Sequence, residues 1–324
     1  MSLEHFKIID ITELYGKELL FYAELSKIFK QLEQEAGIPK EEQYKSIESY
    51  NESNTKAIIL KNIAKDGFGT VHRMEVMPLK FAELSVQQLA KFHSLSFVIE
   101  EKLPKYFENN LRILEQSTKF DDNFKRFFRN VNNFAIAELD SVTRERLEIR
   151  LPEILERFQD YMSGNKARVK CLCHGDYKMN NILMKTEDGE VSEVIPVDYQ
   201  LLHYGTPITD LIYLIFTGSD QEFRRNHLNH LKDMYYDTME SYLKYFNIDI
   251  ETKYARKTFE RDFDQCLEFG LSVALFILPF FFILKDEVPD LNKTDILDVS
   301  ANLDNRYRER LLGVIDDMIN WGKL

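Results

Sequence analysis

The sequence contains few cysteines, prolines and glycines, and it has no long apolar segment. Its three cysteines are an odd, sparse set, which fits a reducing compartment and excludes a disulfide framework. Eight prolines and twelve glycines are spread thinly over 324 residues, so the composition predicts no low-complexity linker. The most apolar segment, 271–284, is too short to span a bilayer. We predict a buried core helix there and no membrane insertion.

A secretory signal and a nucleic-acid partner are also disfavoured. Residues 1–10 have no apolar run of the kind that a secretory signal needs. The net charge of -12 would repel a nucleic-acid backbone. With 44% hydrophobic and 30% charged residues, the composition is that of an ordinary soluble protein with enough chain for two lobes. We therefore expect a cytoplasmic protein.

A polar motif in the middle of the chain organises our interpretation. It reads Cys-His-Gly-Asp from Cys173 to Asp176, and after four intervening residues comes Asn181. A later apolar run ends in a second acid, Asp198. Two carboxylates and one amide offer only oxygen ligands, which suit a hard cation such as Mg²⁺.

A hairpin is predicted between the two parts of this motif. The pair Asp188-Gly189 is a strong short-range hairpin signal. We predict that residues 181–185 and 191–197 pair as antiparallel strands around it. That pairing would bring Asp176, Asn181 and Asp198 to one end of a sheet.

This layout is that of phosphoryl-transfer catalytic loops, in which an Asp accepts the substrate proton while an Asn and a later Asp hold metal. Here Gly replaces Arg after the His, and Asp-Tyr-Gln at 198–200 replaces Asp-Phe-Gly. The pattern resembles small-molecule kinases of the aminoglycoside phosphotransferase and choline kinase type. Cys-His-Gly-Asp, Asn180-Asn181, Asp-Tyr-Gln, Tyr204-Gly-Thr-Pro and Asp210-Leu resemble more closely the ecdysteroid kinase-like family.

The resemblance extends from about Leu14 to the C-terminal helices, and it implies both a fold and two cofactors. The fold is α+β and protein-kinase-like, with a reduced N-lobe over 1–63 and a large, mostly helical C-lobe over 64–324. The cofactors are ATP and Mg²⁺, and the partner is a small hydroxylated molecule.

The resemblance also implies roles for individual residues. Asp176, with His174 and Asn181, would form the catalytic loop, and Asn181 and Asp198 would hold the metal. Asp210 would be a buried anchor for the loop backbone, although an acid in a first helical turn is also favoured by the helix dipole alone. Lys178 is either a phosphate contact or a solvated lysine.

The nucleotide side is less well matched. Glu18 stands where the family has a helix Glu that pairs with a strand Lys, and a solvated helix-face Glu is an equal alternative. Leu60, Lys61 and Ile63 fall where the family has its adenine hinge, with Lys and Asn in place of two acids. We interpret Gly67-Phe68-Gly69 as a plain turn.

Two histidine-containing patterns are better explained by structural roles than by catalysis or metal binding. His93 lies on the apolar face of a predicted helix, and we interpret it as packed and hydrogen-bonded. Cys171, Cys173 and His174 suggest zinc only weakly, because successive strand residues point to opposite faces and no partner Cys-x-x-Cys exists.

Periodicity and punctuation predict the remaining elements. We expect strands over 44–50, 56–60 and 166–173, and helices over 11–36, 79–100, 107–116, 121–138, 143–162, from 207, 222–246, 252–284 and 295–321.

The chain departs from the family at its start, where neither a glycine-rich loop nor its strand Lys is found. We expect an N-terminally truncated member. Three hypotheses stay open. The first is a kinase of a steroid-like or xenobiotic hydroxyl, which the many aromatic residues favour. The second is a catalytically impaired, binding-only pseudokinase. The third is a kinase of the choline or aminoglycoside type.

Overall fold

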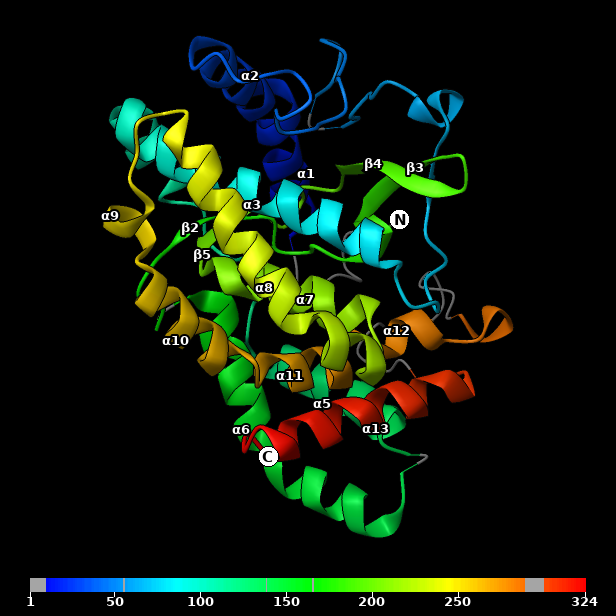
Figure 1. Ribbon diagram of the computed structural model, residues 1–324. Coiled ribbons are helices and arrows are strands. Elements are labelled where there is room, and N and C mark those ends of the chain that lie inside the picture. The colour runs from blue at the N-terminus through cyan, green and yellow to red at the C-terminus, as the bar shows by residue number, and fades with distance from the viewer. Residues whose placement is uncertain (1–9, 55, 138, 165, 289–299) are drawn as a thin grey trace.

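The computed structural model describes residues 10–54, 56–137, 139–164, 166–288 and 300–324, and the protein has the expected α+β, kinase-like fold. Helices dominate, and two small antiparallel sheets lie among them, one ordered β1-β3-β4 and the other pairing β2 with β5. Figure 1 shows α2 and α13 at opposite ends of the molecule, with the strands and α3 between them.

The N-terminal helix is confirmed, with one irregularity. α1 (Ile11–Leu20) and α2 (Ser26–Glu35) are joined by a π-helical segment, η2 (Phe21–Leu25). The carboxylate of Asp10 caps the start by accepting from the N–H groups of Thr12 and Glu13. The η2 segment buries Phe21, Tyr22 and Leu25, and α2 continues this buried face, so the helix is fixed against the rest of the protein.

The two strands predicted over 44–50 and 56–60 are wrong as strands. The segments meet only at an isolated bridge between Ser49 and Leu60. The hydroxyl of Ser53 accepts from the N–H of Ile59 at 2.9 Å and donates to its carbonyl at 3.2 Å. A side chain that bonds the backbone in this way competes with a strand ladder.

The segment 67–69 is a turn only at its first residue. Gly67 ends the 3-10 helix η3 (Ile63–Asp66) with φ of 90°, which glycine adopts readily. The next residues form β1 (Phe68–Thr70), which pairs with β3 (Ile182–Glu187). Our prediction missed this strand because three residues carry too little alternation to recognise.

The central hairpin is confirmed. β3 and β4 (Glu190–Pro196) pair antiparallel with Ile182 opposite Pro196. Asp188 and Gly189 make the turn, both with positive φ, as a two-residue hairpin turn requires. The strand predicted over 166–173 is shorter than expected: only β2 (Cys171–Cys173) pairs, with β5 (His203–Gly205).

The helices that follow β1 agree with most of the predicted ranges. They are α3 (Leu79–Lys102), α4 (Pro104–Tyr106), η4 (Phe107–Leu111), α5 (Asp122–Ala135), α6 (Ser141–Ser163), η5 (Met179–Asn181), α7 (Pro207–Gly218), α8 (Gln221–Lys244), α9 (Ile250–Tyr254), α10 (Arg256–Cys266), α11 (Phe269–Phe276), α12 (Pro279–Phe282), η6 (Lys285–Glu287) and α13 (Asn305–Asn320).

Three of the predicted ranges need correction. The helix expected over 107–116 is one π-helical turn, η4. The helix expected over 252–284 is four helices, α9 to α12, because Ala255 is extended and Pro279 starts a new helix. The helix expected over 295–321 begins at 305 in the structure, and residues 295–299 lie outside the described residues.

The apolar segment 271–284 lies in the core, as predicted, although it is divided between α11 and α12. Every residue of α11 is buried, and α11 packs against α7, which is also buried throughout. In the described part of the chain, no single helix is long and apolar enough to cross a membrane. Only α10 with Phe269–Phe282 passes that test as a pair, and the pair is bent by 41°.

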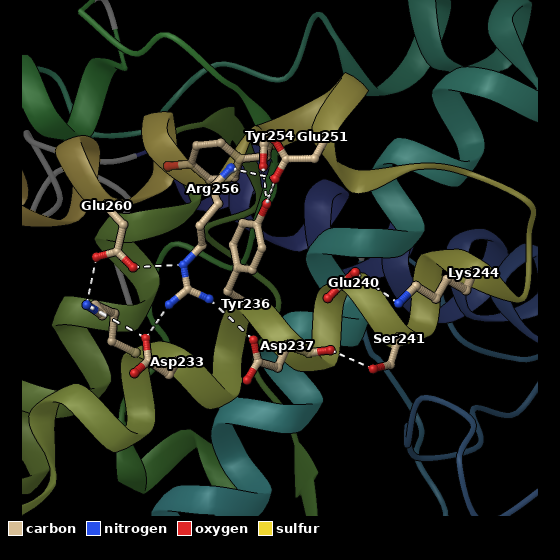
Figure 2. Close-up of polar contacts among 11 residues, drawn as sticks. Asp233, Tyr236, Asp237, Glu240, Ser241, Lys244, Glu251, Tyr254, Arg256 and Glu260 are labelled. Carbon is tan, nitrogen blue, oxygen red and sulfur yellow. Dashed lines mark hydrogen bonds and ion pairs between the residues drawn. The ribbon is translucent and has the colours of Figure 1, made fainter.

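An ion-pair cluster at Arg256 ties α8, α9 and α10 together (Figure 2). Its guanidinium bonds to Glu260 at 2.8 Å, to Asp237 at 3.3 Å and to Asp233. The same group lies over the ring of Tyr236, 4.7 Å from its centroid. Because these groups are partly exposed, we assign the cluster to helix orientation rather than to the active site.

Candidate active site

The candidate site begins at the loop that follows β2. The carboxylate of Asp210 holds this loop. The carboxylate of Asp210 accepts from the N–H of His174 at 2.6 Å and from the N–H of Gly175 at 3.0 Å. Gly175 has φ of 81°, and a Cβ there would lie 2.2 Å from the carbonyl oxygen of Leu201. Only glycine fits this crossing of two backbones.

Asp210 lies in the first turn of α7 and is buried. His93 on α3 bonds its Oδ2 through Nε2 at 3.1 Å, and the other ring nitrogen bonds the hydroxyl of Tyr235 at 2.6 Å. Burial would raise the pKa of Asp210, but the hydrogen bond and charge of His93 outweigh it and lower that pKa. His93 is thus packed and hydrogen-bonded as predicted, and its contact with the loop anchor was missed.

Three donors surround the carboxylate of Asp176, which is 5% exposed. Its Oδ1 accepts from the hydroxyl of Tyr213 at 2.9 Å. Its Oδ2 accepts from Lys178 Nζ at 2.7 Å and from Asn181 Nδ2 at 2.8 Å. Lys178 is therefore an ion-pair partner of Asp176 rather than a freely solvated lysine.

The hairpin brings Asn181 close to the second acid. The backbone carbonyl of Asn181 accepts from the N–H of Val197 at 2.8 Å, one residue before Asp198. Asp198 has a φ of 70°, a left-handed backbone conformation that is unusual outside glycine. The structure therefore brings together the three residues that we expected at this end of the sheet.

Asp198 and Glu18 form a second acidic group on the other side of the site. Burial, and then the charge of Asp176, raises the pKa of Asp198. Burial, and then the charge of Asp198, raises the pKa of Glu18 to about 7. Within the described ranges neither acid has a lysine, arginine or histidine in ion-pair contact. Glu18 is thus half-buried rather than freely solvated, and no lysine pairs with it within the described ranges.

Tyr199, the residue after Asp198, is locked in the core. Its ring stacks on Phe21 of η2 with centroids 3.3 Å apart, and its hydroxyl bonds that of Tyr44 at 2.6 Å. The side chain is fully buried. This packing joins the segment that carries Asp198 to the N-terminal helix that carries Glu18.

The proposed hinge residues lie in a separate turn. Leu60 pairs with Ser49, and the backbone N–H of Lys61 donates to Glu48 at 2.9 Å. The side chain of Lys61 is exposed and pairs with Asp66 at 3.1 Å. Ile63 is buried at the start of η3. Within the described part of the chain, none of these residues makes a hydrogen bond or an ion pair with Asp176, Asp198 or Glu18.

His174 contacts protein groups on both sides. Its Nε2 bonds the carbonyl of Val197 at 3.1 Å, and burial lowers its pKa, so the ring is a neutral link between the loop and the segment just after β4. His93 rather than His174 lies beside the cysteines: its ring and the thiols of Cys171 and Cys173 have ligand atoms within 4.8 Å. Burial raises the pKa of both thiols, which disfavours the thiolate that a metal needs.

Together with the mostly helical fold, this loop and hairpin define the class of the protein, a kinase-like small-molecule phosphotransferase. The model of the ecdysteroid kinase-like family matches residues 2–248, and the chain belongs to that family.

Individual relatives are distant. An uncharacterized kinase-like protein of Caenorhabditis elegans is 24% identical over 318 residues, which cover 94% of this chain and 76% of the relative. A choline kinase structure from Cryptosporidium parvum matches 94% of this chain and 81% of its own, with 13% identity and a TM-score of 0.45. A putative aminoglycoside phosphotransferase from Ralstonia eutropha matches 96% and 82%, with 10% identity and a TM-score of 0.40.

Proposed function

We propose that the protein is an ATP- and Mg²⁺-dependent phosphotransferase that acts on a hydroxyl group of a small molecule. The observation that carries the proposal is a pair of hydrogen bonds at Asn181: its amide donates to the carboxylate of Asp176, and its backbone carbonyl accepts from the N–H of Val197, beside Asp198. These bonds join a candidate base to a candidate metal-binding pair within one hairpin. Family membership gives the same reaction class.

The donor set fits Mg²⁺. Asn181 uses its amide nitrogen on Asp176, so its amide oxygen is the end left for a metal, and Asp198 adds a carboxylate. Both are hard oxygen ligands. Burial, and then the neighbouring acid, raises the pKa of both Asp198 and Glu18, and a divalent cation would stabilise their charged forms. Asn181 and Asp198 would hold the ion, and its charge would neutralise the phosphates of ATP.

Asp176 carries the proton chemistry in this mechanism. Its carboxylate orients the acceptor hydroxyl and takes the hydroxyl proton late, as the new O–P bond forms. Lys178, 2.7 Å from Oδ2, adds a positive charge where negative charge accumulates. His174 and Asp210 hold the loop in place, so the base needs no rearrangement before it acts.

We propose a bulky, largely apolar acceptor such as an ecdysteroid-like steroid or a xenobiotic, because the chain carries 24 phenylalanines and 16 tyrosines. Choline and aminoglycosides are cations and call for anionic walls instead. A wide acceptor screen with isotopically labelled ATP separates these classes. Transfer to hydroxylated apolar compounds supports the steroid or xenobiotic class, and transfer only to amino alcohols or amino sugars contradicts it.

A binding-only role is the second candidate, and Glu18 favours it. No cation pairs with this acid in the described part of the chain, whereas the family's Glu pairs with a lysine. Such a protein would keep the acceptor pocket and transfer phosphate poorly. The same acceptor screen identifies this case as binding of a compound without its phosphorylation.

Nucleotide binding is tested first, by the melting temperature with and without Mg-ATP. A ligand that binds only the folded state raises stability, so the test needs no acceptor. We expect a Mg²⁺-dependent rise that Asp198→Ala abolishes. Glu190→Ala is the matched control, since it removes an exposed acid from β4 of the same hairpin. The absence of any rise in a cooperatively folding protein would contradict the proposed function.

A further inference from the structure

We propose that Tyr213 is a positioning residue for phosphoryl transfer, because its hydroxyl holds the catalytic carboxylate of Asp176 in the orientation that receives the acceptor. The inference rests on the proposed function. It starts from the hydrogen bond between Tyr213 and Asp176 Oδ1, 2.9 Å long, which the sequence did not reveal.

Tyr213 lies three residues after Asp210, so both project from the same face of α7. Asp210 holds the loop through the backbone N–H groups of His174 and Gly175. Tyr213 holds the side chain of the residue that follows them. One turn of a buried helix thus fixes both the path of the loop and the direction of its carboxylate.

The two oxygens of Asp176 have unequal surroundings. Oδ2 accepts from two donors, Lys178 Nζ and Asn181 Nδ2, whereas Oδ1 accepts from a single donor among the described residues, the hydroxyl of Tyr213. Oδ1 therefore keeps a free lone pair, which can accept the hydrogen bond of the acceptor hydroxyl. Since Tyr213 bonds this same oxygen, it sets the rotation of the carboxylate and so the direction of that lone pair.

The hydroxyl of Tyr213 is suited to this task. The side chain is 6% exposed and belongs to a helix that is buried throughout, so its position is rigid. Burial, and then the charge of Asp176, raises the pKa of Tyr213 well above its ordinary value, which keeps the phenol a neutral donor. Tyr213→Phe would remove this one hydrogen bond and leave the ring in place.

The test is kinetic where the acceptor screen yields a substrate. Tyr213→Phe should lower kcat roughly 10- to 100-fold, the cost of a misplaced reacting group, with the Mg-ATP-dependent rise in melting temperature unchanged. In the Asp176→Asn background the same substitution should change the residual rate by less than about twofold, because its effect passes through Asp176. An unchanged kcat, or an equal loss in both backgrounds, would overturn the inference.

A matched control separates positioning from stability. Tyr307 on α13 is also buried, and its hydroxyl donates to the carbonyl of Ala274 at 3.0 Å. Tyr307→Phe should lower the melting temperature about as much as Tyr213→Phe and leave kcat unchanged. Equal losses of kcat in both variants would assign the effect to stability and overturn the inference.

A second readout does not depend on activity. If the unsubstituted protein phosphorylates no acceptor, the proposed function fails, and crystal structures of the unsubstituted protein and Tyr213→Phe decide the positioning. A rotated or doubled conformation of the Asp176 carboxylate in the variant alone supports it. An identical single conformation in both structures overturns it.

Discussion

The two acids at the end of the hairpin differ in their surroundings. Asp176 is surrounded by donors from Tyr213, Lys178 and Asn181, and Asp210 holds its loop. Asp198 lies near Asp176, Glu18 and Lys178, and burial together with the charge of Asp176 outweighs the lysine and raises the pKa of Asp198. The first acid is thus organised by hydrogen bonds from the protein. The second acid is crowded by other acids and has no lysine, arginine or histidine in ion-pair contact within the described ranges, which fits the metal site that we propose.

The largest expected effect comes from a change to Asp176, the acid that the protein organises. Asp176→Asn keeps the size of the side chain and removes its capacity to take a proton. Turnover should fall roughly 10²- to 10⁴-fold, the range for a general base. The Mg-ATP-dependent rise in melting temperature should persist, since Asn181 and Asp198 are untouched. Turnover that survives this substitution would show that Asp176 does not have the proposed role.

Removal of the anchor should cost stability. Asp210→Ala leaves the N–H groups of His174 and Gly175, and the ring of His93, without their buried acceptor. We expect a loss of about 3 kcal/mol in the free energy of unfolding, measured with urea. Asp121→Ala is the control, because it removes only the cap of α5 and should cost about 1 kcal/mol. Equal losses would mean that Asp210 is only a helix-start acid.

Removal of the positive charge of Lys178, which lies beside Asp176, should have a smaller effect. Lys178→Met keeps much of the side chain's length and removes the charge beside Asp176 Oδ2. We expect turnover to fall roughly 10²-fold, as for loss of one electrostatic contact in a transition state. The comparison is Lys166→Met, an exposed lysine that pairs with Asp160. A normal rate in Lys178→Met would return this residue to a purely structural pairing.

The smallest effect concerns the crowded half. The pKa of Glu18 is raised from 4.5 to about 7, so the fold favours its neutral form, and this acid makes the protein less stable as the pH rises through that interval. Glu18→Gln should therefore raise the melting temperature at about pH 8 and change it little at about pH 5. Exposed Glu35→Gln should show no such dependence, and a pH-independent effect of Glu18→Gln would refute the assigned cause. Saturating Mg-ATP should shrink the gain.

The sequence was sufficient for the hairpin and for the residues at its end. Asp188-Gly189 is a local signal, and the spacing from Asp176 to Asn181 is local too. Both could therefore be recognised from the sequence alone. Asp210 was also found, but through the family resemblance, since an acid in a first helical turn is common and does not by itself indicate an anchor. The hairpin determines where the backbone places Asp176, Asn181 and Asp198, so their proximity follows from a local pattern.

What the sequence did not reveal depends on contacts between distant segments. Tyr213 looked like one more core aromatic, and nothing local distinguishes it from Tyr307. His93 reaches Asp210 from a helix more than a hundred residues earlier in the chain. The breaks between α9, α10, α11 and α12 were missed because the apolar spacing continues across them. Ser53 replaced a strand ladder with a side-chain bond that propensity alone does not predict.

Gly175 has one further consequence. Protein kinases carry an arginine at this place in the loop, and phosphorylated activation loops are ordered through arginine–phosphate pairs. Here the carbonyl of Leu201 passes 2.2 Å from where a Cβ would stand, so no side chain of any kind can occupy the position. The carboxylate of Asp210 holds the loop instead, through the backbone N–H groups of His174 and Gly175. A phosphate added to a neighbouring segment would therefore find no arginine partner at this position of the loop.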